Sequence, residues 1–146
     1  MPTINTYLNF NGNCEQAFLF YKSVFGGEFS YIGRFAEMPP QENIPPVSPD
    51  MANKIMHVSL PISKETLLMG SDTDGEWAPE YKQGNNFSIS VNADSREEAD
   101  KLFAALSDGG LVTMPMAETF WGAYFGMCTD GFGVNWMISF DEGEQG

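Results

Sequence analysis

Two stretches of this chain repeat the same order of sequence patterns, and this repeat is the strongest constraint on its fold. In each stretch a strand pattern comes first, a helical pattern follows, a pair of glycines ends the helix, and further strand patterns come after it. Ala17 matches Ala99 and Gly26 matches Gly109, so the repeat is about 82–83 residues long. A supersecondary unit that occurs twice predicts two similar modules.

The first copy predicts a β-α-β-β-β module at about residues 3–72. Residues 5–10 alternate as a half-buried strand does, and residues 14–25 carry an apolar stripe at helical spacing. Asn13 is the expected N-cap, with Gln16 at the N3 position of a capping box. The remaining strand patterns of this module cover residues 29–35, 54–62 and 66–71.

The second copy repeats this order at about residues 86–140, after a linker at about 73–85. A strand pattern at 86–91 precedes a helix that Asp94 or Ser95 caps, with Glu97 or Glu98 at N3. Three more strand patterns follow at residues 111–118, 123–129 and 134–140. The expected fold is α+β, with two βαβββ modules in a single domain of residues 1–146.

The charge balance narrows the classes of partner. The chain has 20 Asp and Glu against 7 Lys and Arg, a formal net charge of −13 at pH 7. Such a surface repels nucleic-acid phosphates and anionic membranes, so neither is an expected partner. The N-terminus shows no secretory signal pattern, and no stretch approaches the roughly 18 apolar residues of a membrane span. We expect a cytoplasmic protein.

Residues 36–53 interrupt the first module with a proline-rich segment. Prolines prevent regular ladder pairing because they lack a backbone N–H donor. A segment of this length predicts a lid, an arm that reaches a partner subunit, or a mobile loop. Its prolines are Pro39, Pro40, Pro45, Pro46 and Pro49.

Several motifs along most of the chain match one protein superfamily. Tyr7-Leu8-Asn9-Phe10-Asn11-Gly12 is followed by Phe25-Gly26-Gly27-Glu28, then by Met56-His57-Val58-Ser59-Leu60 and Leu68-Met69-Gly70-Ser71-Asp72. The last motifs are Trp121-Gly122-Ala123-Tyr124-Phe125-Gly126 and Asp130-Gly131-Phe132-Gly133-Val134-Asn135-Trp136. Together they resemble the PhnB-like branch of the vicinal-oxygen-chelate (VOC) superfamily.

The resemblance implies a fold and a range of activities. Members include glyoxalase I, extradiol dioxygenases, fosfomycin-modifying enzymes and bleomycin resistance proteins, and their paired βαβββ modules form a cup-shaped barrel. The resemblance also implies a homodimer. PhnB-like proteins often carry a 3-demethylubiquinone methyltransferase label, but this sequence has no strand–Gly-x-Gly–helix element suited to S-adenosylmethionine. Enzymatic activity is therefore not assignable from the sequence.

In the enzymes of this superfamily a divalent metal sits in the cup, held by the first and last strands of each module. Those positions fall here on Asn5 (or Thr6), Asn86, Met69 and Met137. None of these is His, Glu, Asp or Cys, and a thioether is too soft a donor for Mg²⁺, Mn²⁺ or Zn²⁺. We expect no metal and no cofactor.

His57 is the only histidine and the candidate catalytic residue. As an acid/base group or an anchor for an anion it would use the chemistry typical of histidine near neutral pH. As a structural residue it would hydrogen-bond within its strand. Cys14 begins a helix, where a thiol pKa is expected to fall, but there is no second histidine to complete a nucleophilic pair. Cys14 and Cys128 are expected to be free thiols.

Strand alternation predicts a neutral, polar lining for the cup. Trp121 and Tyr124 follow a turn and are expected at its rim, whereas Trp136 is expected to pack within the sheet. The candidate ligand-binding residues are Tyr7, Asn9, His57, Asn86, Ser88, Trp121, Tyr124 and Met137. These residues favour a metal-free protein that binds an unknown small molecule. The alternatives are a lyase, isomerase or oxygenase that uses His57 with an irregular metal site, and a scaffold without a ligand.

Overall fold

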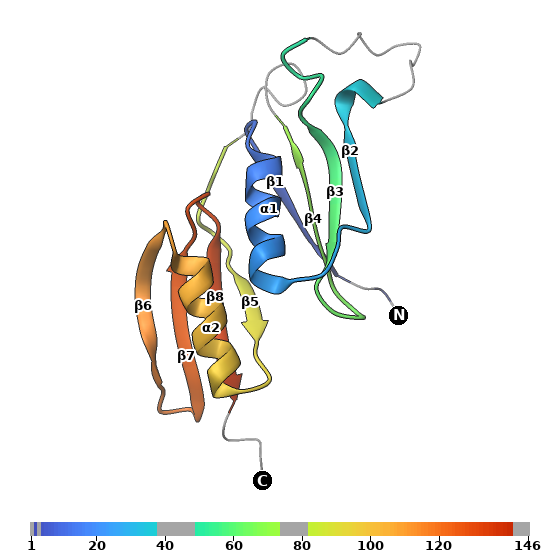
Figure 1. Ribbon diagram of the computed structural model, residues 1–146. Coiled ribbons are helices and arrows are strands. Elements are labelled where there is room, and N and C mark those ends of the chain that lie inside the picture. Colours follow the sequence, from blue (N-terminus) through green and yellow to red (C-terminus); the bar gives the residue numbers. More distant parts are fainter. Residues whose placement is uncertain (1, 3, 38–48, 74–81, 142–146) are drawn as a thin grey trace. The chain divides into compact units, whose positions relative to one another are not determined.

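The chain divides into two compact units, Met1–Tyr81 and Lys82–Gly146. A computed structural model describes residues 2, 4–37, 49–73 and 82–141 (Figure 1). The boundary between the units falls in the segment that the sequence predicts as a linker. Among these described residues, each unit has one four-stranded sheet and one long helix.

The first unit has the element order β-α-β-β-β, with a short 3₁₀ helix after its second strand. Its strands run in the spatial order β1-β4-β3-β2; β1 is parallel to β4, and the other neighbours are antiparallel. The elements are β1 (Thr6–Phe10), α1 (Cys14–Phe25), β2 (Tyr31–Arg34), η1 (Phe35–Glu37), β3 (Ile55–Pro61) and β4 (Leu67–Asp72).

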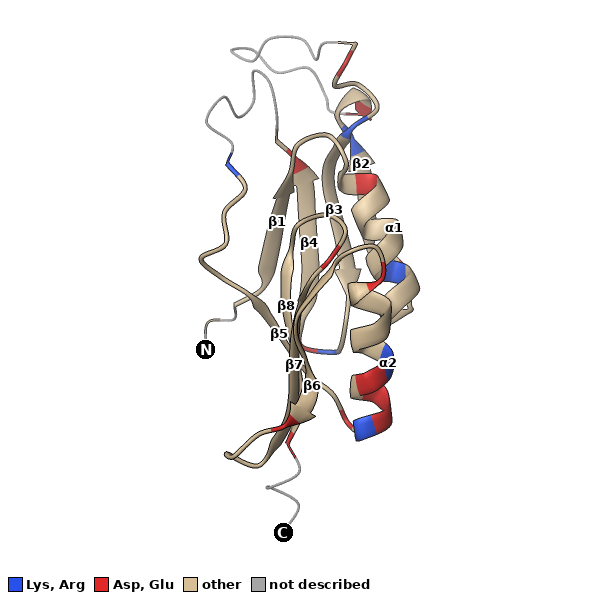
Figure 2. Ribbon diagram, turned by 90° about the vertical axis from the view of Figure 1, so that its left-hand side faces the viewer, with Lys and Arg blue, Asp and Glu red and all other residues tan. Residues whose placement is uncertain are grey.

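Helix α1 packs against one face of this sheet (Figures 1 and 2). Phe18 lies at the centre of the contact, with edge-to-face rings at 6.1 Å from Phe10 and 5.4 Å from Tyr21. A Cβ on Gly70 would lie 2.6 Å from the Phe18 ring, so the glycine lets helix and strand approach closely. The core of this face also buries Leu8, Ala17, Val58, Leu60 and Leu68.

The second unit repeats this arrangement with the order β5-β8-β7-β6, in which β5 and β8 are parallel. Helix α2 covers one face, where Gly126 lies against Phe103 and Met116. The elements are β5 (Ile89–Asn92), α2 (Arg96–Ser107), β6 (Leu111–Glu118), β7 (Ala123–Thr129) and β8 (Asn135–Asp141). The expected α+β fold with two βαβββ modules is confirmed.

The first strand of the second unit is shorter than the sequence pattern indicates. It covers 89–92 rather than 86–91, because its partner β8 begins at Asn135 and pairing starts with Ile89 opposite Trp136. Phe87 is 56 % exposed. Asn86 and Ser88 therefore precede the strand instead of belonging to it.

The proline-rich segment is described only at its two ends. Strand β2 ends at Arg34, earlier than predicted, because η1 begins at Phe35. The two ends lie side by side, since Phe35 N donates to Lys54 O and Ala36 N donates to Ala52 O. The hypotheses of a lid or an arm concern mainly residues 38–48, which lie outside the described residues.

The two helices begin in different ways. Ser95 caps α2 and accepts a hydrogen bond from Glu98 N at 3.0 Å, so the second of the predicted alternatives holds. Asn13 precedes α1 but makes no side-chain capping bond, contrary to the prediction. The acceptor at the start of α1 is instead a carboxylate from β4. Both helices end at glycines with positive φ, Gly26 and Gly109.

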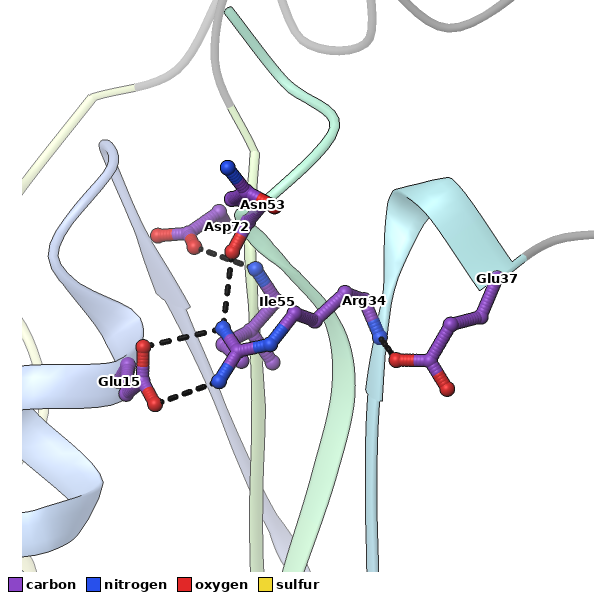
Figure 3. Close-up of polar contacts among 6 residues, drawn as sticks. All are labelled: Glu15, Arg34, Glu37, Asn53, Ile55 and Asp72. Atoms are coloured by element: carbon purple, nitrogen blue, oxygen red, sulfur yellow. Dashed lines mark hydrogen bonds and ion pairs between the residues drawn. The ribbon is translucent and has the colours of Figure 1, made fainter.

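The carboxylate that accepts hydrogen bonds at the start of α1 belongs to Asp72, which is 2 % exposed. Its Oδ1 accepts hydrogen bonds from Gly12 N at 3.0 Å and Cys14 N at 2.9 Å. Its Oδ2 accepts a hydrogen bond from Ile55 N at 2.8 Å, which Figure 3 shows. A carboxylate is well placed there because the helix N-terminus carries partial positive charge. Asp72 thus joins α1, β3 and β4, a role that sequence reasoning missed.

We expect Asp72→Asn to destabilise the first unit by about 2–3 kcal/mol, because a neutral amide cannot accept all three hydrogen bonds. Urea unfolding at neutral pH measures the loss of unfolding free energy. Hydrogen exchange should show faster exchange of the Gly12, Cys14 and Ile55 amides. Glu97→Gln, an exposed change on α2, is the control. Unaltered protection of those three amides would contradict this role.

Candidate functional site

The first sheet has one face turned away from α1, which we call open face 1. Residues directly opposite in register point to the same side of a sheet. Met69 is opposite both Tyr7 and Ser59, Ser59 is opposite Tyr31, and His57 is opposite Gly33. These pairs place side chains from all four strands on one surface. Its members are Tyr7, Asn9, Tyr31, Gly33, His57, Ser59, Met69 and Ser71.

His57 lies at the centre of this surface, and both of its ring nitrogens are engaged. Nδ1 is 3.2 Å from the Tyr7 hydroxyl, and Nε2 is 3.0 Å from Ser59 Oγ. Both hydroxyls can donate or accept, so either neutral tautomer of the imidazole satisfies the chain of hydrogen bonds. The imidazole is therefore held in place while its proton can sit on either nitrogen.

Two tyrosine rings flank the imidazole. The ring centroids of Tyr7 and Tyr31 lie 5.6 and 5.8 Å from that of His57. The tyrosines are 42 % and 49 % exposed, whereas Ser59 is buried at 7 %. The surface thus has a buried polar floor and half-exposed aromatic sides.

Gly33 makes room for the second tyrosine. A Cβ at this position would lie 2.6 Å from the Tyr31 hydroxyl oxygen and 3.0 Å from two ring carbons. The Tyr31 ring thus covers the backbone of Gly33, directly across the strand pair from His57. Because Gly33 does not have a positive φ, a side chain there would displace Tyr31 without straining the backbone.

Of the predicted ligand-binding residues, only Tyr7, Asn9 and His57 belong to open face 1. Asn86, Ser88, Trp121, Tyr124 and Met137 belong to the second unit. Met137 lies on the face of its sheet turned away from α2, and Trp121 is 57 % exposed in the turn before β7. Tyr31, Gly33 and Ser59 were missed. Alternation from His57 could have indicated Ser59, but the other two needed the β2–β3 register.

Tyr124 lies on the α2 side of its sheet. Its hydroxyl donates to Asp100 Oδ1 at 2.5 Å, and the Arg96 guanidinium lies 4.0 Å above its ring. The hydrogen bond to Asp100 raises the pKa of Tyr124. These contacts tie the strand to the helix. Trp136 is buried, and its Nε1 donates to Asp130 at 2.9 Å, in agreement with the packing role predicted for it.

The cysteines are not activated nucleophiles. Burial raises the pKa of Cys14, and the carboxylates of Asp72 and Glu15 raise it further. The expected lowering by the helix N-terminus is wrong, because the Asp72 carboxylate lies at that same end of α1. Burial, with a contribution from Asp130, raises the pKa of Cys128 to about 11.

The positions that would hold a superfamily metal do not fit a hard divalent ion. Asn5 Oδ1 already accepts a hydrogen bond from Leu67 N at 3.1 Å, and Met69 presents a thioether beside Tyr7. Within the described ranges, no three His, Cys, Asp or Glu side chains gather as metal ligands would. The donors at these positions are amides and thioethers, which are poor ligands for Mg²⁺, Mn²⁺ or Zn²⁺.

Arg34 anchors the strand that carries Tyr31 and Gly33 (Figure 3). Its guanidinium binds Glu15 in a bidentate pair, with N–O distances of 3.0 and 2.6 Å. Its Nη1 also donates to Asn53 O at 2.8 Å, and its backbone N donates to Glu37 at 3.1 Å. Together these bonds connect β2 to α1 and to both ends of the proline-rich segment.

Acidification should weaken this anchor. Hydrogen bonding to Arg34 holds the pKa of Glu15 below its usual value. A carboxyl with a lowered pKa contributes stability above its unfolded-state pKa, and this contribution is lost as the pH falls through the folded-state pKa. We expect urea unfolding to show less acid destabilisation in Glu15→Gln than in the parent.

The difference should be about 1 kcal/mol at most, because the pair is partly exposed and screened by water. Glu97→Gln, with an exposed carboxyl on α2, serves as the control and should lose stability on acidification as the parent does. An equal loss in Glu15→Gln and the parent would contradict the assignment.

Gly33→Ala should move Tyr31 away from His57 while the fold is kept. Loss of the neighbouring ring current should shift the His57 ring protons in the NMR spectrum. Tyr31→Leu should cause a similar shift, and adding Gly33→Ala to it should cause little more, because coupled changes are not additive. Unchanged His57 resonances in Gly33→Ala would show that Gly33 does not position this ring.

Comparison with known proteins agrees with this architecture. The model of a family described as 3-demethylubiquinone-9 3-methyltransferase matches residues 2–139. Protein YjdN of Escherichia coli K12 is 33 % identical over 144 residues, which cover 95 % of each chain.

Solved structures share the fold. Protein PA1353 from Pseudomonas aeruginosa has 40 % identity and a TM-score of 0.81, over 97 % of this chain and 98 % of its own. A PhnB protein from Bacillus cereus that carries the same methyltransferase description has 25 % identity and a TM-score of 0.72, over 95 % and 99 %.

A glyoxalase/bleomycin resistance protein/dioxygenase family enzyme from Burkholderia phytofirmans shares the fold at 18 % identity and a TM-score of 0.61, over 93 % and 97 % of the two chains. With two βαβββ modules and a family match over nearly its whole length, this chain belongs to the family described as 3-demethylubiquinone-9 3-methyltransferase, is PhnB-like, and has the fold of glyoxalase/bleomycin resistance protein/dioxygenase family proteins.

Proposed function

We propose that this protein binds a small organic molecule on open face 1 and does so without a divalent metal. The observation that carries the proposal is the arrangement around His57: an imidazole held at both nitrogens between two half-exposed tyrosine rings. Half-exposed aromatic side chains around a fixed polar centre are typical of ligand sites.

The chemistry of this face favours a particular class of ligand. The Tyr7 and Tyr31 rings offer stacking surfaces, and their hydroxyls can donate or accept hydrogen bonds. The eight residues of open face 1 include no Lys, Arg, Asp or Glu. In a chain of net charge −13, this neutral surface disfavours anions. The ligand is therefore a neutral or cationic molecule with a planar, unsaturated part.

The methyltransferase description of the family does not match the local chemistry. A nucleotide-type cofactor is commonly bound at the N-terminus of the helix that follows the first strand. Here the amides of Gly12 and Cys14, at that end of α1, already donate to Asp72. Small-molecule binding is the function that this geometry supports better. A homodimer and a cytoplasmic location, both implied at the level of the sequence, stay predictions.

A proton-transfer enzyme is the second candidate. The chain Tyr7–His57–Ser59 links a half-exposed hydroxyl to a buried one through an imidazole, and such a chain can move a proton by exchanging tautomers. A lyase or isomerase would use His57 in this way. The two candidates differ in one measurable property, which is whether a bound molecule is converted.

Screening with planar aromatic fragments by protein-observed NMR tests the proposal. Fragments that bind should perturb the resonances of Tyr7, Tyr31 and His57, and Tyr7→Ala should weaken them by about tenfold through loss of one stacking face. Tyr124→Phe, which alters a tyrosine hydroxyl on the α2 side of the other sheet, should leave the affinities unchanged.

Perturbations confined to other parts of the chain, or equal affinities in Tyr7→Ala and the parent, would refute the binding site. The same spectra follow the fragments over time. A product that forms with the parent but not with His57→Gln would favour the enzyme over the binding protein, because glutamine keeps hydrogen-bonding groups but cannot carry the proton.

A further inference from the structure

Three methionines stand in one row across the second sheet. Met114 on β6 is directly opposite Met127 on β7, and Met127 is directly opposite Met137 on β8. Residues opposite each other in register point to the same face, so the three thioethers share one side of the sheet. Ser90 on β5 continues the row beyond Met137.

This row lies on the face turned away from α2. Gly126 and Ile138, which alternate with Met127 and Met137, lie on the α2 side, where Gly126 contacts Phe103. Met114 is 45 % exposed, and Met127 and Met137 are partly exposed. Methionines usually fill gaps in a core. Met116 does so here, with its sulfur against Gly126 on the α2 side, but the three of the row do not.

An irregularity in β6 brings Met114 into the row. Val112 is opposite Cys128, so a regular ladder would place Thr113 opposite Met127. The register shifts between Val112 and Met114, and Met114 takes that place instead. A second shift follows between Met114 and Ala117. Bulges redirect side chains and are common beside functional sites.

We propose that Met114, Met127 and Met137 form a binding site for a soft monovalent metal ion of the Cu(I) class. Thioethers are soft donors that select Cu(I) over hard divalent ions. Directly opposed Cβ atoms lie about 4.5–5.5 Å apart. Methionine has an unbranched, flexible side chain, so the flanking thioethers can lean toward the central Met127. The same softness that makes Met137 unsuitable for a divalent ion suits it to this one.

The cysteine thiols, which are also soft ligands, are buried, whereas the thioethers of the row are partly exposed. Cys128 is 1 % exposed, and burial raises its pKa to about 11, so it stays a shielded thiol at neutral pH. In the first unit, Cys14 is fully buried. The net charge of −13 adds a general attraction for cations.

Titration with Ag(I), a diamagnetic ion with the same preference for sulfur, tests this site. The protein carries ¹³C-methyl methionine and is held in chloride-free buffer with silver nitrate as the probe. One equivalent should shift the methyl resonances of Met114, Met127 and Met137 and leave those of Met69 and Met116 in place. Met127→Leu removes the central donor at nearly constant volume and should weaken binding at least about tenfold.

The controls distinguish specific Ag(I) binding at the row from non-specific binding to any methionine. Met69→Leu changes a partly exposed methionine that stands alone on open face 1, and Met116→Leu changes one on the α2 side; both should bind Ag(I) as the parent does. Met137→Leu repeats the test if Met127→Leu does not fold. An absence of shifts, equal shifts at all methionines, or unchanged affinity in a folded Met127→Leu or Met137→Leu would overturn the proposal.

Discussion

The buried Asp72 carboxylate is the interaction on which the first unit depends. It accepts three backbone N–H groups, two at the start of α1 and one at the start of β3. A buried anion is tolerated only where hydrogen bonds replace its hydration. Because Asp72 ends β4, it sets where the helix and the central strands begin relative to one another. Arg34 connects β2 to α1 through its ion pair with Glu15. Open face 1 is formed by β2 together with β1, β3 and β4.

The two units share a topology but use different chemistry to hold it. In the second unit the buried carboxylate is Asp130, in the turn before β8, where it accepts from Phe132 N, Val134 N and the Trp136 indole. Its helix relies on the Ser95 hydroxyl instead of a carboxylate from a strand. The faces turned away from the helices differ in the same way. One is aromatic and polar around a histidine, and the other carries a row of thioethers.

Sequence reasoning identified the helices well and singled out three of the eight residues of open face 1. The residues predicted for both helices match α1 and α2 closely, because an apolar stripe that ends at a glycine is a local signal. The strand predicted at 86–91 failed at its start because pairing depends on where β8 begins. His57 was singled out as the only histidine, but its neighbours Tyr31 and Ser59 are 26 and 2 residues away. The first could be placed only through strand register.

The sequence alone determined the repeat, the order of helix and strands along each module, the acidic character and the unsuitability of Asn5, Met69 and Met137 for a hard metal ion. These properties follow from composition and short-range periodicity, which need no knowledge of distant contacts. Only the tertiary structure decided that Asp72 starts a helix 58 residues before it, that Tyr124 faces Asp100, and that Met114 joins Met127 through a bulge. The physical reason is that hydrogen-bond partners and strand registers join residues far apart in the chain, and neither is encoded in a local pattern.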